Sequence, residues 1–367
     1  MTARFFAPAF RVRVNGSGLE GDVSAHVTSV SVVREPGVPS RCDISLANPL
    51  PEMRWTHSDD WKLFQEGNSV EVAMGYADDL HVVFDGEVTG MTPSFPESGG
   101  PTLQVQAHDR LHRLQVVRRE RTLTRGKYEL LVKQIAGAAN LTPAVDDTGP
   151  EHPYMVQSGR TDYDFLRALA RVIGFEVFVE GKTLHFRRPE STGSPVLALA
   201  WGSAAAAGPV PGLPGVPVYP LRSFSPQLDA RQQVTEVIVR GQDPLSREGF
   251  EGRATARDVP AAGREPAADV AYKAFGVRNE LYVGDEPVAT QAEAKQRARA
   301  IFAEKAMQLV RGSGSTLGLP ELKPGTTVHL EGLGPRFGGR YYVSRVTHRM
   351  DGGGFSTGFE ARKDALG

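Results

Sequence analysis

The chain has 367 residues, a length that predicts two or three domains, each able to bury a core of its own. Its 40 glycines and 26 prolines favour short strands joined by many turns, and its single cysteine excludes an internal disulfide. The 42 Lys and Arg against 43 Asp and Glu give a formal net charge of −1, which provides no general electrostatic reason for a nucleic-acid or anionic-membrane partner.

The N-terminal stretch MTARFFAPAF has too short an apolar part for a secretory signal. No run along the chain reaches the ~18 apolar residues that a membrane helix requires. We therefore expect a protein without stable membrane insertion, cytoplasmic at least during its assembly.

The first 118 residues carry six or so short strand signals, which predict a β-sandwich or barrel. These signals are FRVRVNG, DVSAHVTSVSVV, RCDISLANPLP, NSVEVAMGY, HVVFDGEVTGM and PTLQVQAHD. In the third signal Cys42, Ile44 and Leu46 alternate with polar residues, as the inward face of a strand does. A cysteine nucleophile needs an activating neighbour, so this pattern favours a buried core thiol over a reactive one.

Residues 119–192 change character and predict a small α/β module. The helix signal YELLVKQIAGAAN is followed by TDYDFLRALARVIGF, which has Thr161 as an N-cap and Gly174 as its end. Two strands, FEVFVEG and TLHFRR, then follow across a turn at Gly181 and Lys182.

Residues 193–220 are rich in Ala, Pro and Gly, which predicts a linker or surface loop in place of a core element. Residues 221–367 return to strand signals, beginning with RQQVTEVIVRGQDP. Within them Thr290 and Glu293 form a capping box that predicts a helix over about 290–310, ended by Gly312. The helix face with Ala294, Ala298 and Ile301 is predicted to pack, and three further strand signals close the chain.

The closing strands repeat the first domain. FQEGNSVEV parallels LKPGTTVHL, GEVTGM parallels SRVTHRM, and each copy ends in a strand that finishes with Ala, TLQVQA or STGFEA. The spacing from Gly67 to Val88 equals the spacing from Gly325 to Val346. We therefore predict two similar barrels, with Val70 and Val72 in one strand matching Val328 and Leu330 in the other as inward side chains.

Three stretches carry a resemblance to a known family. The stretches are residues 75–114, residues 161–186 and TEVIVRGQDP. Together they resemble the late control protein D family of contractile phage tails, and the N-terminal hub part of the spike proteins of type VI secretion and of extracellular contractile injection systems. The resemblance spans about residues 8–363.

This resemblance implies a mainly β fold with α+β insertions, in which two tail-tube-like β-barrels flank the small α/β module. It also implies a structural, non-enzymatic homotrimer: a baseplate hub that adapts the sixfold tail tube to the threefold spike of a phage tail or injection particle. The expected partners are the tail tube protein, a spike protein and other baseplate subunits. No catalytic residue, cofactor or metal site is carried over, and no nucleic-acid specificity is expected.

The chain ends five residues after the final strand signal, at Gly367. Fused spike proteins continue beyond the hub, so we expect the spike to be a separate protein that docks at the C-terminal face. The charged residues near that end, Glu360, Arg362, Lys363 and Asp364, could orient the docking, while shape and apolar contact are expected to dominate its affinity.

The stretch AHDRLHRL holds His108 and His112, four residues apart, a spacing that can bind a metal on a helix. A zinc site needs a third and usually a fourth ligand, and no such cluster is found in the sequence. In the family pattern Asp109 instead caps a short turn from Arg110 to Leu114. The structural corner is therefore the favoured interpretation.

Two other motifs invite functional readings. The stretch RGSGSTLG, residues 311–318, lacks the G-K-[ST] of a phosphate loop and follows a helix, so it predicts a helix exit. The basic run RRERTLTRGK, residues 118–127, has no interleaved aromatic residues and favours a solvated or intersubunit face over a nucleic-acid site. A hub-associated cell-wall hydrolase and a glycan-binding receptor module remain the alternatives of other classes.

Overall fold

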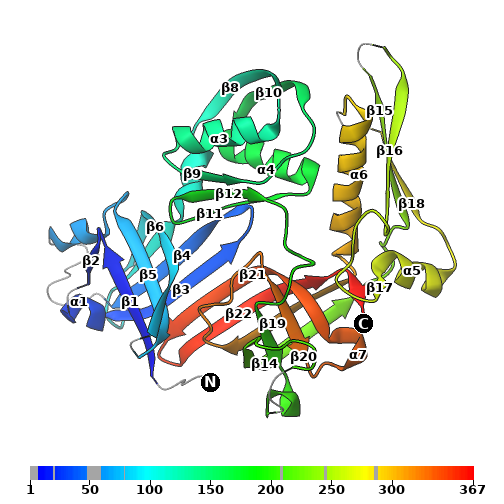
Figure 1. The fold of residues 1–367 in the computed structure, drawn as a ribbon. Coiled ribbons are helices and arrows are strands. Elements are labelled where there is room, and N and C mark those ends of the chain that lie inside the picture. Colours follow the sequence, from blue (N-terminus) through cyan, green and yellow to red (C-terminus); the bar gives the residue numbers. More distant parts are fainter. Residues whose placement is uncertain are drawn as a thin grey trace.

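The computed structural model is built around one long sheet that runs through two barrels, with smaller units standing on one side of it (Figure 1). It describes residues 7–19, 21–47, 59–77, 79–206, 210–243, 246–284 and 288–367. The end of the third strand signal, residues 48–51, lies outside these ranges. No helix within them is long and apolar enough to cross a membrane.

The first barrel is formed by six strands in the order β1-β5-β6-β7-β4-β3, with the two-residue β2 at the edge of β1. The elements are β1 (Pro8–Val14), β2 (Ser17–Gly18), α1 (Gly21–Ala25), β3 (Val27–Glu35), β4 (Val38–Ala47), η1 (Asp59–Phe64), β5 (Ser69–Tyr76), β6 (Asp79–Ser94) and β7 (Thr102–His108). The alternation in β4 is confirmed, because Cys42, Ile44 and Leu46 are fully buried. Burial also raises the pKa of the Cys42 thiol, so Cys42 is a neutral core residue.

One strand prediction in the first barrel starts too early. Residues 22–25 of the second signal belong to the helical turn α1, which begins at Gly21, and the strand begins at Val27. The helical turn places Val23 in the core of the first barrel, at 7% exposure. Local alternation therefore did not show where the chain bends.

The module follows β7 through a short 3-10 helix, η2 (Arg110–Gln115). Its elements are β8 (Arg118–Gly126), α3 (Tyr128–Ala138), β9 (Thr142–Val145), β10 (His152–Thr161), α4 (Asp162–Ile173), β11 (Glu176–Glu180) and β12 (Thr183–Arg187). Thr161 caps α4 by accepting from the Asp164 N–H, and Gly174 ends it with φ +72°, as predicted. Leu111 and Leu114 of η2 belong to the module's core.

The second barrel has the same strand order as the first, β13-β20-β21-β22-β19-β14, and pairing of β14 with β13 closes it. Its elements are β13 (Leu197–Ala200), η3 (Gly202–Ala206), β14 (Val218–Leu228), β19 (Val310–Leu317), β20 (Thr327–Glu331), α7 (Gly334–Phe337), β21 (Gly339–Asp351) and β22 (Gly354–Lys363). The prediction of a loop over 193–220 is wrong at β13, whose four residues are all buried between β20 and β14. The apolar run LALA forms a buried strand although the residues around it are rich in Ala, Pro and Gly.

Residues 236–306 leave the second barrel as an arm (Figure 1). The arm contains β15 (Glu236–Gln242), β16 (Gly249–Thr255), β17 (Glu265–Pro266), α5 (Ala267–Phe275), β18 (Glu280–Val283) and α6 (Gln291–Ala306), and β17 pairs with the C-terminal β23 (Ala365–Leu366). Ala294 and Ala298 are buried where α6 meets β16. A Cβ on Gly252 would come within 2.1 Å of the Ala294 carbonyl carbon, so glycine allows this close approach.

The predicted end of α6 is wrong, and so is the predicted helix exit after it. The helix stops at Ala306, and residues 310–317 form β19, paired between β14 and β22. Gly312 lies beneath Phe224, and Gly314 beneath both Phe224 and Phe359; an added Cβ would meet the rings at 2.5 to 2.9 Å. Glycines that resemble a helix end in the sequence therefore make room for rings inside a strand.

Candidate assembly site

The two barrels repeat the same turn before their matching strands. Gly67 and Gly325 both have left-handed backbones, with φ of +88° and +80°. The strands that follow bury Val70 and Val72 in one barrel and Val328 and Leu330 in the other, all fully. These positions agree with the predicted repeat.

The match of Val88 with Val346 is wrong by three residues. The Gly67 N–H donates to the Val88 carbonyl at 2.9 Å, and the Gly325 N–H donates to the Val343 carbonyl at 2.8 Å. A register shift follows at once in both strands, between Val88 and Gly90 and between Val343 and Arg345. The equal spacing in the sequence was therefore accidental, although the repeat is present.

Pairing across four strands fixes the equivalence of the barrels. The first barrel aligns Val32, Cys42, Ala107 and Val88 side by side, and the second aligns Pro226, Gly312, Ala361 and Val343. The predicted Ala endings are thus equivalent residues. In this register β3 corresponds to β14, and β21 corresponds to β6.

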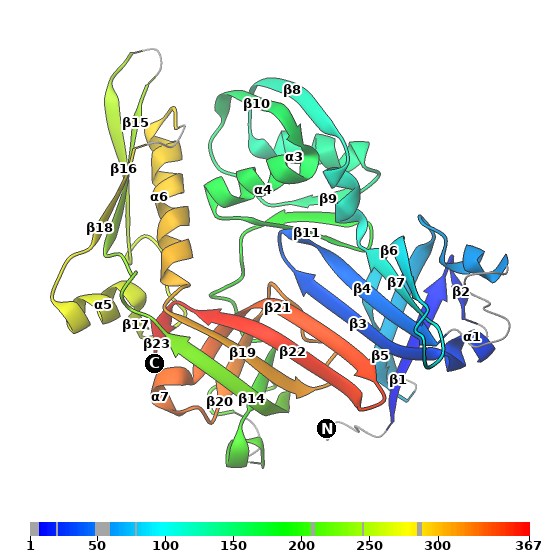
Figure 2. The same cartoon turned by 180° about the vertical axis from the view of Figure 1, so that it is seen from behind.

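The barrels are joined edge to edge by β3 and β21 (Figure 2), in antiparallel register from Val346 opposite Arg34 to Met350 opposite Val30. At the centre of the joint lies His348, fully buried, with Nδ1 at 3.0 Å from the Thr357 hydroxyl. Burial, reinforced by the nearby Arg34, lowers the pKa of His348 to about 3. A neutral imidazole therefore occupies the joint at ordinary pH.

The AHDRLHRL stretch forms the corner that leads from the first barrel into the module. Asp109 accepts from the Leu111 N–H at 3.0 Å and from the Ser40 N–H at 2.7 Å, so it caps η2 as predicted and also anchors the start of β4. His108 Nδ1 contacts the Thr89 hydroxyl at 2.7 Å, while His112 Nδ1 contacts the Asp109 carbonyl at 2.8 Å. The two histidines have separate partners, and no group of three metal-ligating side chains occurs in the described ranges.

The module is held at equivalent points of the two barrels. In the first barrel Glu87, at 7% exposure, accepts from the Arg113 guanidinium, with Nε at 2.8 Å. Its equivalent in the second barrel is Tyr342, whose hydroxyl donates to Glu176 of the module. Arg187 donates to Glu176 at 3.0 Å and to the carbonyl of the turn at Gly325 at 2.9 Å. The module therefore bridges the joint between the barrels.

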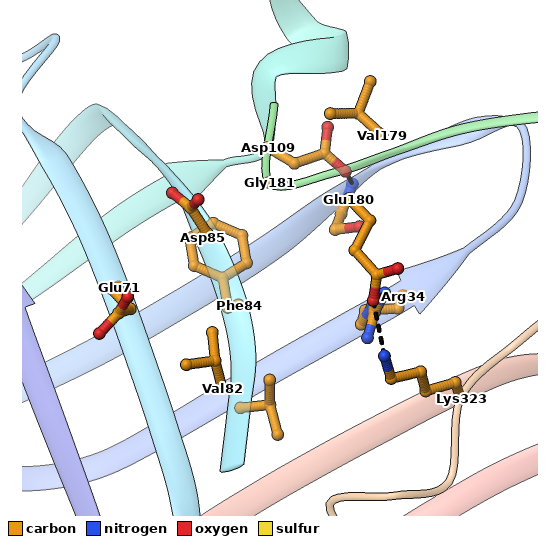
Figure 3. Close-up of a pocket in the computed structure, with 12 residues that line it drawn as sticks. Arg34, Glu71, Val82, Phe84, Asp85, Asp109, Val179, Glu180, Gly181 and Lys323 are labelled. Carbon is orange, nitrogen blue, oxygen red and sulfur yellow. Dashed lines mark hydrogen bonds and ion pairs between the residues drawn. The ribbon is translucent and has the colours of Figure 1, made fainter. Parts of the chain in front are cut away.

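A cavity of about 340 Å³ lies where the first barrel, the module and the loop before β20 meet (Figure 3). Glu180 projects between Arg34 and Lys323 and bonds them at 3.3 and 2.8 Å. Burial opposes ionisation, yet the two cations hold the pKa of Glu180 below its usual range. On the far side of the cavity Arg110 joins Asp85 at 3.0 Å. The charges here tie three units together.

The arm helix α6 supports the module from its other side. His152 Nδ1 lies 2.9 Å from Glu293 Oε1, with both side chains buried. Gln296 donates to the Thr148 carbonyl at 2.8 Å, and Arg297 donates to the Arg171 carbonyl at 2.8 Å. Glu293, predicted only as half of a capping box, thus also orients the module. This second role had no signal in the sequence.

The basic run 118–127 forms β8, and its charges are largely engaged within the module. Arg121 and Arg119 lie 2.5 and 3.3 Å from the carboxylate of Asp162. Arg118 donates to the Gly159 carbonyl at 2.7 Å, and Lys127 lies 2.7 Å from Asp147. Most of this face is therefore occupied by internal pairs.

The expectation that all four charges near the C-terminus orient docking is wrong for two of them. Lys363 is 2% exposed and donates to the Gly338 carbonyl beside the Tyr341 ring. Asp364 is 4% exposed and accepts from the Ala262 N–H at 3.0 Å. Both charges hold the chain end against the arm and the second barrel.

Solved structures share this fold over nearly the whole chain. The 43 kDa tail protein of prophage MuSo2 from Shewanella oneidensis has a TM-score of 0.68 at 14% identity, covering 98% of this chain and 100% of that one. The tail protein from Neisseria meningitidis MC58 has a TM-score of 0.68 at 13% identity, covering 98% and 97%. An E. coli protein described as a component of the type VI secretion system has a TM-score of 0.57 at 13% identity, covering 96% and 76%.

The family model described as Alg8 N-terminal domain matches residues 7–352. No curated protein matches the chain. These three solved structures, all below 15% identity, show the fold alone.

Proposed function

The chain belongs to the Alg8 N-terminal domain family, and we propose that it is a structural baseplate hub of a contractile phage tail or contractile injection system. We further propose that three copies form the hub and adapt a sixfold tube to a threefold spike. The likeness to late control protein D hubs is part of this proposal and rests on the ordered motifs in the sequence.

The observation that carries the proposal is the repeat itself. Two barrels with the same strand order lie side by side in one chain, joined through β3 and β21. Three such chains present six similar barrels, so one closed ring matches six tube subunits and still has threefold symmetry. A tube ring built from six separate, identical subunits does not need two barrels in one chain.

The neighbouring proteins support this role by what they are called. Two are tail proteins, and one is a component of the type VI secretion system described as structurally similar to bacteriophage T4 tail proteins. We propose the same class of partners for this chain: a tube protein, a spike protein and other baseplate subunits. The role is proposed to be non-enzymatic, because the charged clusters near the joint serve to hold units together.

A reconstruction of the assembled particle tests the proposal by counting copies. We expect three copies in one ring between the tube and the spike, with interfaces that bury more than ~2,000 Å² in total, as obligate assemblies do. Six copies, or one, would refute the adapter. Spike density at the turns near Gly37, with Gly367 facing the tube, would show that the proposed polarity is reversed.

A further inference from the structure

A groove of about 570 Å³ opens where helix α5, the short helix α7 and the last residues of the chain meet. It lies on the arm side of the second barrel, away from the module and from the joint of β3 with β21 (Figure 1). The pairing of β17 with β23 holds the start of α5 against residues 365–366. The groove is therefore built from paired elements of the fold.

The floor of the groove is apolar and belongs to the core of the second barrel. Val270 and Leu366 line it and are 8% and 7% exposed, as members of the core cluster. Ala274 and Pro335 also line it, and both are exposed. An apolar side chain that enters such a groove leaves water and gains contacts, which favours binding.

Helix α5 forms one wall and leaves the core halfway along its length. Four of its first five residues, up to Ala271, are buried. The rest of the helix exposes Tyr272 by 47% and Phe275 by 56%, and Val277, just after the helix, is 64% exposed. Aromatic side chains are enriched where proteins contact one another. Apolar surface thus extends beyond the groove along the end of α5.

The groove also carries an excess of positive charge. Three cations, Arg264, Lys273 and Arg336, and one carboxylate, Glu265, line it. Glu265 is already bonded to Lys273, with Oε1 at 2.6 Å from Nζ. Among the residues that the structure describes, neither Arg264 nor Arg336 has an ion pair or a side-chain hydrogen bond. Since the whole chain has a formal net charge of −1, this excess is local.

We infer that the groove binds a short segment of another protein in which a carboxylate lies next to an apolar side chain. The apolar side chain covers Val270 and Leu366, and the carboxylate bonds the guanidinium of Arg264 or Arg336. Arginine suits this role because its planar fork binds a carboxylate through two hydrogen bonds. The inference goes beyond the proposed function, because it names a ligand chemistry that requires neither a ring nor a spike.

Both features of the groove are needed for such a ligand. An exposed ion pair alone adds little to affinity, so burial of the apolar side chain supplies most of it. The two arginines select the partner, because a segment without a carboxylate leaves them unpaired. We therefore expect acidic apolar segments to bind and basic apolar segments to be rejected.

A protein segment fits this groove better than a nucleic acid does. Proteins that bind single strands stack the bases on aromatic side chains within a basic groove. None of the described residues that line this groove is aromatic, and its floor is aliphatic. Two unpaired arginines also offer few contacts to a phosphate backbone. The aliphatic floor instead suits a side chain such as Leu, Ile or Phe.

Selection of random peptides on the full-length chain tests the inference. Short random peptides displayed on phage are selected on the wild-type protein and, in parallel, on the double variant Arg264→Ala/Arg336→Ala. We expect the wild type to enrich peptides with Asp or Glu close to Leu, Ile or Phe, and the double variant to lose them. No enrichment, enrichment without a carboxylate, or the same peptides on both proteins would overturn the inference.

Single substitutions then locate the binding of an enriched peptide, measured by fluorescence anisotropy. Arg336→Ala should weaken it about tenfold, the effect of losing a hydrogen bond between charged groups, whereas Arg11→Ala, at an exposed arginine of β1, should not. Ala274→Glu places a like charge in the groove and should weaken binding at least as much. Its control is Ala138→Glu, at an exposed alanine near the end of α3, and circular dichroism checks that each variant is folded.

Reversal of the charges separates contact with the ligand from a merely structural role. The variant Arg264→Glu/Arg336→Glu should lose the acidic peptide and bind the same peptide with Lys in place of its Asp and Glu. A folded variant that binds neither peptide would show that the arginines only shape the groove, and the inference would fail. Displacement of the peptide from wild type by single-stranded oligodeoxythymidine would assign the surface to nucleic acid instead. Since no outcome depends on copy number, the hub and the groove are tested separately.

Discussion

The buried imidazole of His348 makes the barrel joint sensitive to acid. Its pKa is lowered from 6.5 to about 3, first by burial and then by Arg34. Below pH 6.5 the unfolded chain therefore takes up a proton that the folded chain refuses, so the free energy of unfolding falls as the pH falls. The slope grows towards its full value over the first pH unit below 6.5, and the total loss is roughly 2 kcal/mol between pH 6.5 and 4.5.

The variant His348→Asn removes the titration and keeps an amide that can bond the Thr357 hydroxyl. Its smaller side chain costs a constant amount at every pH. The free energy difference between wild type and variant should therefore shift in favour of the variant by roughly 2 kcal/mol between pH 6.5 and 4.5. Urea unfolding between about pH 7 and 4.5, followed by tryptophan fluorescence, measures this difference, and acidic groups common to both proteins cancel from it.

The control is His26→Asn, which changes a partly exposed histidine outside the joint. It reports the cost of replacing a histidine by asparagine away from the joint. Parallel stability curves for wild type and His348→Asn would show that His348 does not stay neutral in the joint, and the reasoning from burial would fail.

Three further changes test the packing and the module's attachment by chemical denaturation. Gly312→Val drives a Cβ to about 2.5 Å from the Phe224 ring and should lower stability by about 1–3 kcal/mol; unchanged stability would show that β19 has room to spare. Asp109→Asn leaves one of its two backbone N–H partners poorly bonded and should cost about 1–2 kcal/mol, whereas a loss near zero would remove its role as the corner anchor. Tyr342→Phe leaves buried Glu176 with one donor fewer and should cost about 1–3 kcal/mol, against no measurable change for the exposed Tyr282→Phe.

Local signals predicted the elements whose ends are chemically marked. Thr161 and Gly174 bound α4 because a hydroxyl cap and a left-handed glycine act over a few residues of chain. The alternation around Cys42 likewise gave the buried face of β4, since a half-buried strand needs only its own period of two. These features depend little on the rest of the fold.

Features set by distant residues could not be predicted. Gly312 is part of a strand because Phe224, far away in the sequence, lies over it, and β13 is buried because β20 and β14 flank it. The module's attachment through Glu87 and Tyr342 uses outward-facing strand positions, where a polar residue gives no hint of its partner. The equal spacing that matched Val88 with Val346 failed for a related reason, because strand pairing, and not distance along the chain, defines equivalent positions.

The position of the module explains how a nearly sixfold object could acquire threefold character. In the proposed ring every barrel contributes equivalent strands, yet the joints alternate. Each joint inside a chain pairs β3 with β21 and is bridged by a module that bonds Glu87 and Tyr342, whereas the proposed contacts between copies lie outside that pairing. Six barrels then share three modules and three arms. A partner that contacts only the barrels meets a pattern close to sixfold, and one that contacts modules or arms meets a pattern that repeats three times.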